Sequence, residues 1–378
     1  MFTVLMVDDD IDVTATVKSH AEETIQEVTF RSQSDFDAAL QTLRDTKPDV
    51  LILDVYRGER TMDNVAAQPI WSQVWRDWFC PIVFYSAGEV AVDNPSVPDH
   101  PFIRVVAKGA NSERQVVEHI RAFASHTQAL RLAVADIERL THIVLRDVAV
   151  PVFKAENDET KRQDMLVRAT RRRVAALMDE MMALTEQPLF GWEQYIFPVL
   201  ASHPIVGDIL RVSAEDPQIP ASYRVLLTPT CDMVPHAGGC KVTHVLLAKC
   251  CGADNFVTKG LSLAKTTPKN KVKDRLPAAL NEAHQSGMIL LPECPGTLPL
   301  MALNLRDLEL VPVVDVIPPR GQQARLTRVA SLDSPFREFI GWAYLQISCR
   351  PGVPPRDHSA AIESLLKEWN PPATEGKK

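Results

Sequence analysis

The sequence predicts an α/β domain at the start of the chain, then a helical connector, then a mostly β domain. Two observations lead to this order. Short apolar runs alternate with helical patterns up to about residue 125, whereas proline and short β-like runs become frequent after about residue 190. With 378 residues, 46% of them hydrophobic, the chain is long enough for two to three domains with buried cores.

The α/β domain is expected over residues 1–125. Its predicted strands are residues 3–7, 27–31, 49–54, 81–85 and 101–106, and its predicted helices lie near 10–23, 34–46, 65–78 and 112–124. Nearly continuous apolar strands that alternate with helices imply a parallel sheet covered on both faces. We therefore predict a flavodoxin-like, doubly wound domain.

The connector, residues 126–189, is rich in Ala, Leu, Arg and Glu and has apolar residues at helical spacing. Pro151 is expected to separate two helices. A packed helix pair without chemistry of its own is the simplest interpretation, and such a pair can also serve as the contact of a homodimer. The run Arg171 to Arg173 can contact nucleic acid, although arginines on a helix surface are usually only solvated.

The third stretch, residues 190–358, is predicted to form a small β barrel or sandwich. Its expected strands are residues 223–227, 242–248, 287–291 and 308–316. A closing helix should follow, capped by Ser334, with Pro335 in its first turn and an apolar face made by Phe336, Phe339, Ile340, Tyr344 and Ile347. Residues 359–378 are expected to form a terminal helix and a disordered tail.

Charge and cysteine content limit the classes of protein that fit. The 41 basic and 48 acidic residues give a net charge of −7, which argues against a surface that binds nucleic acid along its whole length. Residues 1–125 hold 11 of the basic and 20 of the acidic residues, so the acidity belongs to the first domain. Seven scattered cysteines fit a reducing compartment, and neither a signal peptide nor a membrane span is apparent. We expect a cytoplasmic protein without membrane contact.

Three carboxylates should meet at one edge of the first sheet. Asp8 and Asp9 follow the first predicted strand and Asp54 ends the third, and ligands of such sheets bind beyond the carboxyl ends of the strands. Clustered carboxylates repel unless a cation compensates, and oxygen ligands suit Mg²⁺. Ser86 and Lys108 end the fourth and fifth strands and offer a hydroxyl and a positive charge suited to a phosphoryl group. Each aspartate alone could instead cap a helix.

In this order and spacing the residues resemble the receiver domain of two-component response regulators. The matching segments are VDDD with Asp8 and Asp9, LILDV with Asp54, FYSA with Ser86 and VVAKG with Lys108, and the resemblance covers about a third of the chain. It implies that Asp54 accepts a phosphoryl group from a histidine kinase, a phosphotransfer protein or a small phosphodonor. It also implies an Mg²⁺ site formed by Asp8, Asp9, Asp54 and the Tyr56 carbonyl, with Ser86 and Lys108 holding the phosphoryl oxygens.

The chain departs from that family where receivers usually signal. Val105 stands where receivers have an aromatic switch residue, and Gly109 stands where they have a proline after the lysine. The segment 88–102 contains Pro95, Pro98 and Pro101, which oppose the usual fourth helix. We therefore expect phosphorylation to act through the last receiver helix and the connector, on a protein effector.

The third domain contains a cluster of cysteines. Cys231, Cys240 and Cys250, with Cys294 further along, could hold Zn²⁺, but the spacing contains no CxxC pair, and inert buried cysteines explain the pattern more simply. Adjacent Cys250 and Cys251 should point to opposite faces of a strand. An enzyme that uses Cys231 as nucleophile, with His236 or His244 as base, is a weaker alternative.

Two further segments of the third domain bear on its partners. Residues 259–275 carry five lysines and one arginine and could bind phosphate or nucleic acid, but a solvated loop is the simpler expectation. The segments SHPIVGDIL, TPTCDMV and SPFREFIGWAYLQISCRPG resemble a poorly characterised domain fused to divergent receivers, including those of bacterial anti-phage two-component systems of the Detocs kind. That resemblance implies a bacterial signalling protein and supplies no catalytic residues. No helix-turn-helix is recognisable.

Overall fold

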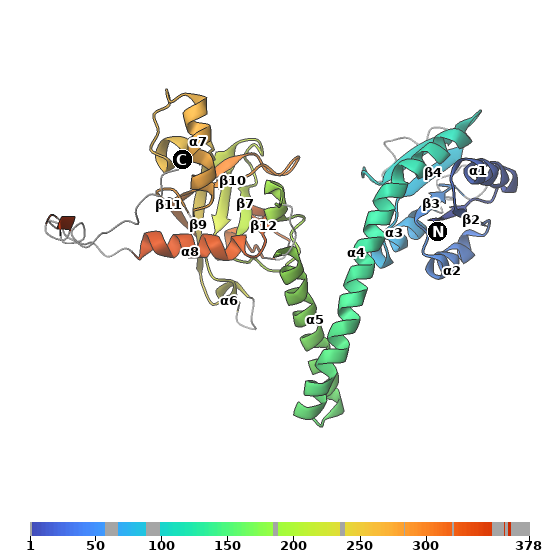
Figure 1. The fold of residues 1–378 in the computed structure, drawn as a ribbon, viewed down its shortest axis with the longest axis horizontal. Coiled ribbons are helices and arrows are strands. Elements are labelled where there is room, and N and C mark those ends of the chain that lie inside the picture. Colours follow the sequence, from blue (N-terminus) through green and yellow to red (C-terminus); the bar gives the residue numbers. More distant parts are fainter. Residues whose placement is uncertain are drawn as a thin grey trace, which may run out of the picture. The chain divides into compact units, whose positions relative to one another are not determined.

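The chain forms two compact units, Met1–Thr185 and Glu186–Lys378. The computed structural model describes residues 2–56, 67–87, 99–183, 188–234, 239–282, 284–319 and 321–349, with residues 359, 362 and 363. Figure 1 shows a helix-covered sheet in the first unit and a second sheet, with its own helices, in the other. Each unit is described by itself below.

The first unit is built on a five-stranded parallel sheet of order β2-β1-β3-β4-β5. The strands are β1 Phe2–Val7, β2 Val28–Gln33, β3 Val50–Leu53, β4 Ile82–Ala87 and β5 Ile103–Lys108. This is the flavodoxin-like order, in which the chain reverses direction across the sheet between β1 and β3 and opens a crevice there. The predicted parallel α/β domain is confirmed.

Helices cover both faces of this sheet. They are α1 Ile11–Thr24, α2 Phe36–Thr46, α3 Ala67–Asp77 and the first turns of α4 Ser112–Ala155. Helices α2 and α3 bury Leu43 and Val74 in the core on one face, and α1 and α4 bury Val17 and Ile120 in the core on the other. Because both faces are covered, the strands are apolar almost throughout, as the sequence indicates.

The connector differs from its prediction at Pro151. Helix α4 runs unbroken for 44 residues and contains Pro151, and the chain turns only at residues 156–158 before α5 Glu159–Ala183. The prediction of a break at Pro151 was wrong. A proline removes a single backbone hydrogen bond, and here it lies close to the helix end, where α5 packs against Val144, Val148 and Val152 and stabilises the last turns.

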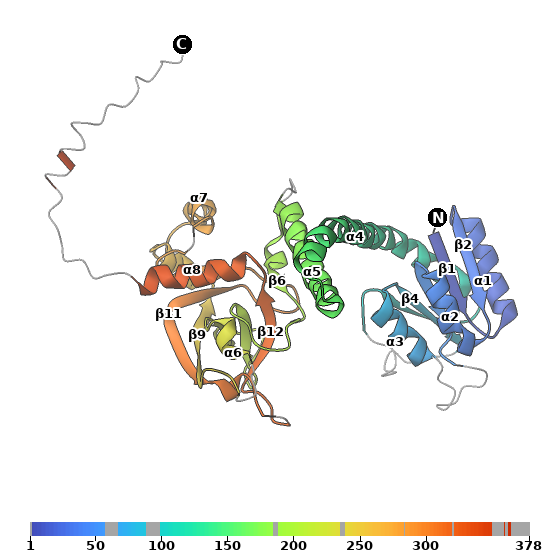
Figure 2. The ribbon, with the colours of Figure 1, turned by 90° about the horizontal axis from the view of Figure 1, so that it is seen from below.

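The second unit contains a seven-stranded antiparallel sheet of order β10-β11-β9-β8-β7-β12-β6. Its strands are β6 Tyr195–Ile196, β7 Asp208–Val212, β8 Tyr223–Leu226, β9 His244–Gly252, β10 Met288–Leu291, β11 Met301–Pro312 and β12 Leu326–Leu332. A separate antiparallel sheet was expected and is confirmed, but β6, β7 and β12 were not predicted. The outer strands β6 and β10 contribute Tyr195 and Leu291 to one core cluster, so the sheet is curved (Figure 2).

Helix α8, Phe336–Ser348, packs on this core as expected, burying Ile340 and Ala343. The predicted Ser334 cap is wrong, because the helix begins after Pro335 and no side chain caps it. The backbone N–H of Arg337 bonds to the carbonyl of Asp333 at 2.9 Å, and the Asp333 carboxylate accepts from the Ser334 N–H at 2.8 Å.

The lysine-rich stretch is not a loop throughout. Residues Lys269–Leu280 form helix α7, and Phe256–Gly260 form a π-helical turn before it. Helix α7 is held by Ala279 and Leu276, which pack against Phe256 and Met288. A short helix α6, Thr230–Met233, follows β8. The predicted terminal helix and tail lie almost wholly outside the described residues. None of the described helices is long and apolar enough to cross a bilayer.

Candidate functional site

The carboxyl ends of three neighbouring strands bring the predicted residues together. Asp8 follows β1, Asp54 follows β3, and Ser86 lies near the end of β4. Lys108 is the last residue of β5. Asp8, Asp54 and Ser86 are buried, whereas Asp9 is exposed at the rim. The sheet order therefore places all of these predicted residues at one edge.

Asp54 is bonded through both carboxylate oxygens. Ser86 Oγ donates to Asp54 Oδ1 at 2.6 Å, and Lys108 Nζ donates to Asp54 Oδ2 at 2.5 Å. The backbone N–H of Tyr56 also donates to Oδ1, at 3.3 Å. A carboxylate held in this way has a fixed orientation at the crevice, and its partners are groups that can equally bind phosphoryl oxygens.

Lys108 also joins Asp54 to Asp8. Its Nζ lies 2.8 Å from Asp8 Oδ2, and the Asp10 N–H donates to Asp8 Oδ1 at 2.9 Å. Asp10 itself caps α1 by accepting from the N–H groups of residues 12 and 13. The alternative of helix capping thus holds for Asp10, and Asp8 faces the cluster instead.

Burial dominates the electrostatics of the site. It raises the pKa of Asp8 to about 6, against the hydrogen bonds from Lys108 and the Asp10 N–H that lower it. Burial also disfavours the charged form of Lys108, but the hydrogen bonds to Asp54 and Asp8 outweigh it, and the pKa of Lys108 is raised. Ionised Asp8 is therefore costly until further positive charge is supplied.

The donor set fits a divalent cation. Ligand atoms of Asp8, Asp9 and Asp54 lie within 4.8 Å of one another, and three carboxylates exceed the single ammonium of Lys108 by two negative charges. Oxygen ligands from few carboxylates, with room for water, are what Mg²⁺ prefers. The Tyr56 carbonyl as a further ligand stays a prediction.

A contact that the sequence did not predict links this site to α4. Tyr85, the neighbour of Ser86 on β4, shares a buried hydrogen bond of 2.7 Å between its hydroxyl and Ser112 Oγ. Ser112 begins α4 and also donates to the Gly109 carbonyl at 2.8 Å. Lys108 Nζ lies 5.7 Å from the centre of the Tyr85 ring. The only sequence signal was a tyrosine and a serine at the ends of a predicted strand and helix.

The departures from receiver sequences have different outcomes. Val105 packs partly buried against the α2–α3 side of the sheet, so this position holds no aromatic switch. A Cβ at Gly109 would meet no atom within 4 Å, which leaves that turn unobstructed. Residues 88–98, with Pro95 and Pro98, lie outside the described residues.

The structure does not bring the four cysteines proposed for zinc together. Cys250 and Cys294 are buried in the core of the second unit, while Cys231 is exposed. Cys240 donates to the Met233 carbonyl at 3.3 Å. The acidic cluster is the sole metal-compatible group found within the described residues. Cys250 faces the main core and Cys251 the opposite side of β9, as expected from strand alternation.

The other alternative sites gain little from the structure. Cys231 Sγ lies 3.7 Å from Asp232 Oδ1, His244 is bonded to Thr243, and His236 lies outside the described residues. Burial raises the pKa of Cys250, which opposes thiolate chemistry there. Arg171 to Arg173 are exposed on α5, as a merely solvated run would be.

Comparisons with known proteins concern the first third of the chain. No family model matches the sequence, and no curated protein matches it. A two-component transcriptional regulator from Clostridium phytofermentans is 18% identical over 35% of this chain and 98% of its own, with a TM-score of 0.28. The response regulator PhyR from Brucella abortus is 14% identical over 35% of this chain and 51% of its own, with a TM-score of 0.27. The strand order, rather than these scores, carries the fold assignment.

Proposed function

We propose that this protein is a response regulator whose Asp54 accepts a phosphoryl group. The observation that carries the proposal is the pair of bonds to Asp54, from Ser86 Oγ at 2.6 Å and from Lys108 Nζ at 2.5 Å, beside the carboxylates of Asp8 and Asp9. A hydroxyl, an ammonium and an acidic cation site around one aspartate suit phosphoryl transfer to that aspartate better than a purely structural role.

In the proposed reaction an Asp54 oxygen attacks phosphorus and forms a P–O bond. The P–N bond of a phosphohistidine breaks, and the imidazole leaves with the electron pair; a small phosphodonor would lose its own oxygen leaving group instead. Asp8, Asp9 and Asp54 would hold Mg²⁺, which offsets the negative charge gathered on the phosphoryl oxygens. Lys108 and Ser86, already on Asp54, would turn to the new phosphoryl oxygens.

The path of output in this proposal runs into α4. If Lys108 shifts toward a phosphoryl group, Gly109 moves with it, and Ser112 is bonded to Gly109 and to Tyr85. A displacement there acts on the start of a 44-residue helix. The second unit and its protein effector would receive the signal from this helix and α5.

Labelling tests the acceptor. The full chain is incubated with acetyl phosphate and Mg²⁺, and the adduct is mapped by mass spectrometry after peptide cleavage. Asp54→Asn should lose the label, whereas Asp164→Asn, a matched change of an exposed aspartate on α5, should keep it. Labelling that persists at full extent in Asp54→Asn would exclude Asp54 as the acceptor.

The helix pair supports a second part of the proposal, a homodimer. Leu130, Val134 and Ile137 continue at spacings of four and three the apolar face that α5 covers further along α4, yet they are 37%, 55% and 42% exposed. We propose that the same face of a second copy covers them. Sedimentation should show a dimer that Val134→Lys dissociates. Leu132→Lys, on the opposite side of α4, should not change the mass.

The remaining partners rest on the sequence resemblance. A histidine kinase or phosphotransfer protein would supply the phosphoryl group, and a bacterial anti-phage system is the proposed setting. Phage plating on cells with the wild-type gene or with Asp54→Asn tests the setting. Equal protection by both would remove phosphorylation from that role.

A further inference from the structure

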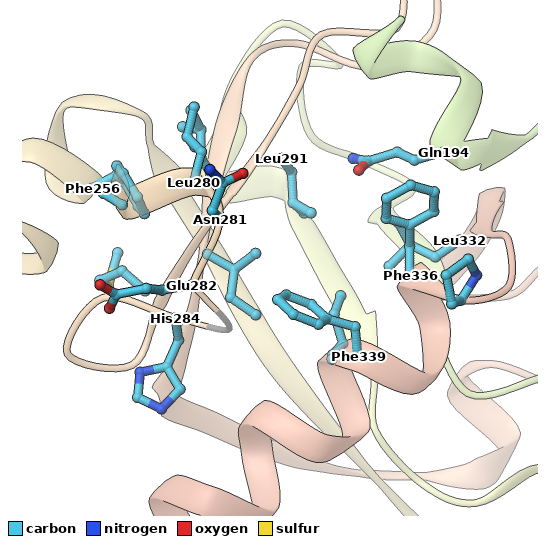
Figure 3. A pocket seen from close by; sticks show the side chains of 16 residues that line it. Gln194, Phe256, Leu280, Asn281, Glu282, His284, Leu291, Leu332, Phe336 and Phe339 are labelled. Carbon is cyan, nitrogen blue, oxygen red and sulfur yellow. The ribbon is translucent and has the colours of Figure 1, made fainter. Parts of the chain in front are cut away.

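A cavity of about 360 Å³ lies in the second unit, beside the outer strand β10 (Figure 3). It is bordered by β10, by the end of α7 and by the first turns of α8. Phe336 and Phe339 project into it from α8. A cavity of this size with an aromatic wall can take apolar groups of a ligand.

The cavity follows the free edge of β10. Its lining includes Leu290, which packs with Phe256 on one face of the strand, and Leu291, which packs with Ile340 on the other. A hollow that borders both faces of an outermost strand lies along the edge of that strand. Unpaired edges are where extended peptides add to sheets.

Leu290 presents a backbone donor and acceptor at this edge. Met288 exchanges hydrogen bonds with Gln285, N–H to carbonyl at 2.8 Å and 2.9 Å, on the side of the strand away from β11. Backbone groups of a strand alternate in direction, so those of Ile289 and Leu291 face β11 and those of Leu290 face the cavity side. Beyond Leu291 the chain continues with Pro292, which has no N–H.

Two side-chain amides add to this set. Gln194 Nε2 is buried and donates to no acceptor within the described part of the chain. Figure 3 shows the Gln194 amide projecting toward Leu291 from one side of the cavity, with Asn281 on the other side. A buried donor without a partner is costly, and a ligand carbonyl would satisfy it.

The charge of the lining excludes several ligands. Glu282 is the sole acidic residue among the described residues that line the cavity, and none of them is a lysine or an arginine. Phosphates and nucleic acid therefore find no counter-charge here. Neutral amide groups around an apolar hollow match an uncharged peptide backbone and one apolar side chain.

We propose that this edge binds an extended, uncharged segment of a partner protein. The segment pairs its backbone with Leu290, donates one carbonyl to Gln194 Nε2 as acceptor, and places an apolar side chain against Phe336 and Phe339. The binding site is independent of the phosphoryl site, and it supplies the contact through which the second unit reaches a protein effector.

Capped peptides test the proposal on the full chain. The probes are fluorescent, C-amidated hexapeptides of Thr and Ser with a central Leu, Ile, Phe or Met, and matched peptides with a central Asp or Lys. Anisotropy should show saturable binding for at least one apolar centre and at least tenfold weaker binding for both charged centres. N-methylation of the central amide should weaken binding by about tenfold or more, because it removes a backbone donor.

Variants assign the site. Gln194→Met should weaken binding about tenfold, and Gln346→Met, the same change on the exposed side of α8, should leave it unchanged. Asp54→Asn should bind as the wild type does, so that failure here is separate from failure of the phosphoryl proposal. The proposal is overturned if no apolar-centred peptide binds, if Gln194→Met binds equally, or if N-acetyl-leucinamide binds as tightly as the peptides, which would indicate a small-molecule site.

Discussion

Lys108 Nζ donates to Asp54 Oδ2 at 2.5 Å while lying 2.8 Å from Asp8 Oδ2, so one ammonium compensates two buried carboxylates from different strands. Removal of that ammonium leaves both carboxylates without their cation. The last residue of β5 is thus a structural centre of the site as well as a candidate ligand for phosphoryl oxygens.

Lys108→Met should lower the free energy of unfolding by about 3 kcal/mol or more in the absence of divalent cations, because buried charges lose their partner. Mg²⁺ should stabilise this variant more than the wild type, since it supplies the missing positive charge. Thermal melting with and without Mg²⁺ measures both effects. Lys18→Met, which breaks an exposed pair with Glu22, should change stability by about 0.5 kcal/mol or less. An equal Mg²⁺ response in wild type and Lys108→Met would contradict this account.

The raised pKa of Asp8, about 6 against 3.8 in the unfolded chain, predicts an unusual pH dependence. Between these values the folded protein keeps a proton on Asp8 that the unfolded chain has released, so the contribution of Asp8 to stability falls as pH rises from about 4 to about 6. Above pH 6 the ionised carboxylate is present and unfavourable. Mg²⁺ needs that ionised form, so its affinity should fall as pH drops below about 6.

Asp8→Asn tests this pH dependence. At pH 7.5 without divalent cations the variant should be more stable than the wild type by roughly 1 to 3 kcal/mol, and it should bind Mg²⁺ more weakly. Urea unfolding between pH 4.5 and 7.5 gives both curves. Asp9→Asn changes an exposed carboxylate of the same cluster and should leave the pH profile of stability as it is. A wild type whose Mg²⁺ affinity is constant from pH 5 to 7.5 would contradict the assignment.

The hydrogen bond between Tyr85 and Ser112 predicts a separation of chemistry from output. Tyr85→Phe removes one hydroxyl, leaves Asp54 and its partners in place, and should cost about 1 kcal/mol of stability. Acetyl phosphate should still label Asp54. Hydrogen exchange in the first turns of α4, which should change on phosphorylation of the wild type, should respond much less in this variant. Loss of labelling itself would place Tyr85 in the reaction rather than in its readout.

The sequence predicted the first sheet and its acidic edge because both depend on local signals. Apolar strands followed at once by Asp8, Asp54 and Lys108 determine which side chains meet once the strand order is known. The strands of the second unit were harder, since β7 contains the charged pair of Asp208 and Arg211 and β12 contains Arg328. Asp208 is fully buried and accepts from Arg328 at 2.7 Å and from Ser331 at 2.5 Å. No local pattern shows that these charges neutralise each other across two strands.

The same limitation applied to Asp49, which no motif identified and which anchors α4 at the edge of the sheet opposite the site. Asp49 is 4% exposed, forms an ion pair with Arg131 and accepts from the Thr3 N–H at 2.7 Å. Arg131 belongs to α4 beyond the part that packs on the sheet core, so this pair extends the contact of the helix with the domain.

Arg131→Met should therefore lower the free energy of unfolding by about 1 to 3 kcal/mol, because it leaves Asp49 buried with fewer partners. Burial already raises the pKa of Asp49 against the Thr3 N–H and Arg131, and loss of the arginine should raise it further. The destabilisation should thus grow from pH 4 to pH 7 as Asp49 ionises in the unfolded chain. Arg146→Met, an exposed arginine further along α4 that pairs with Asp147, is the matched control and should stay within about 0.5 kcal/mol of the wild type. Chemical denaturation at the two pH values measures the difference, and equal effects of the two substitutions would show that Asp49 does not hold the helix.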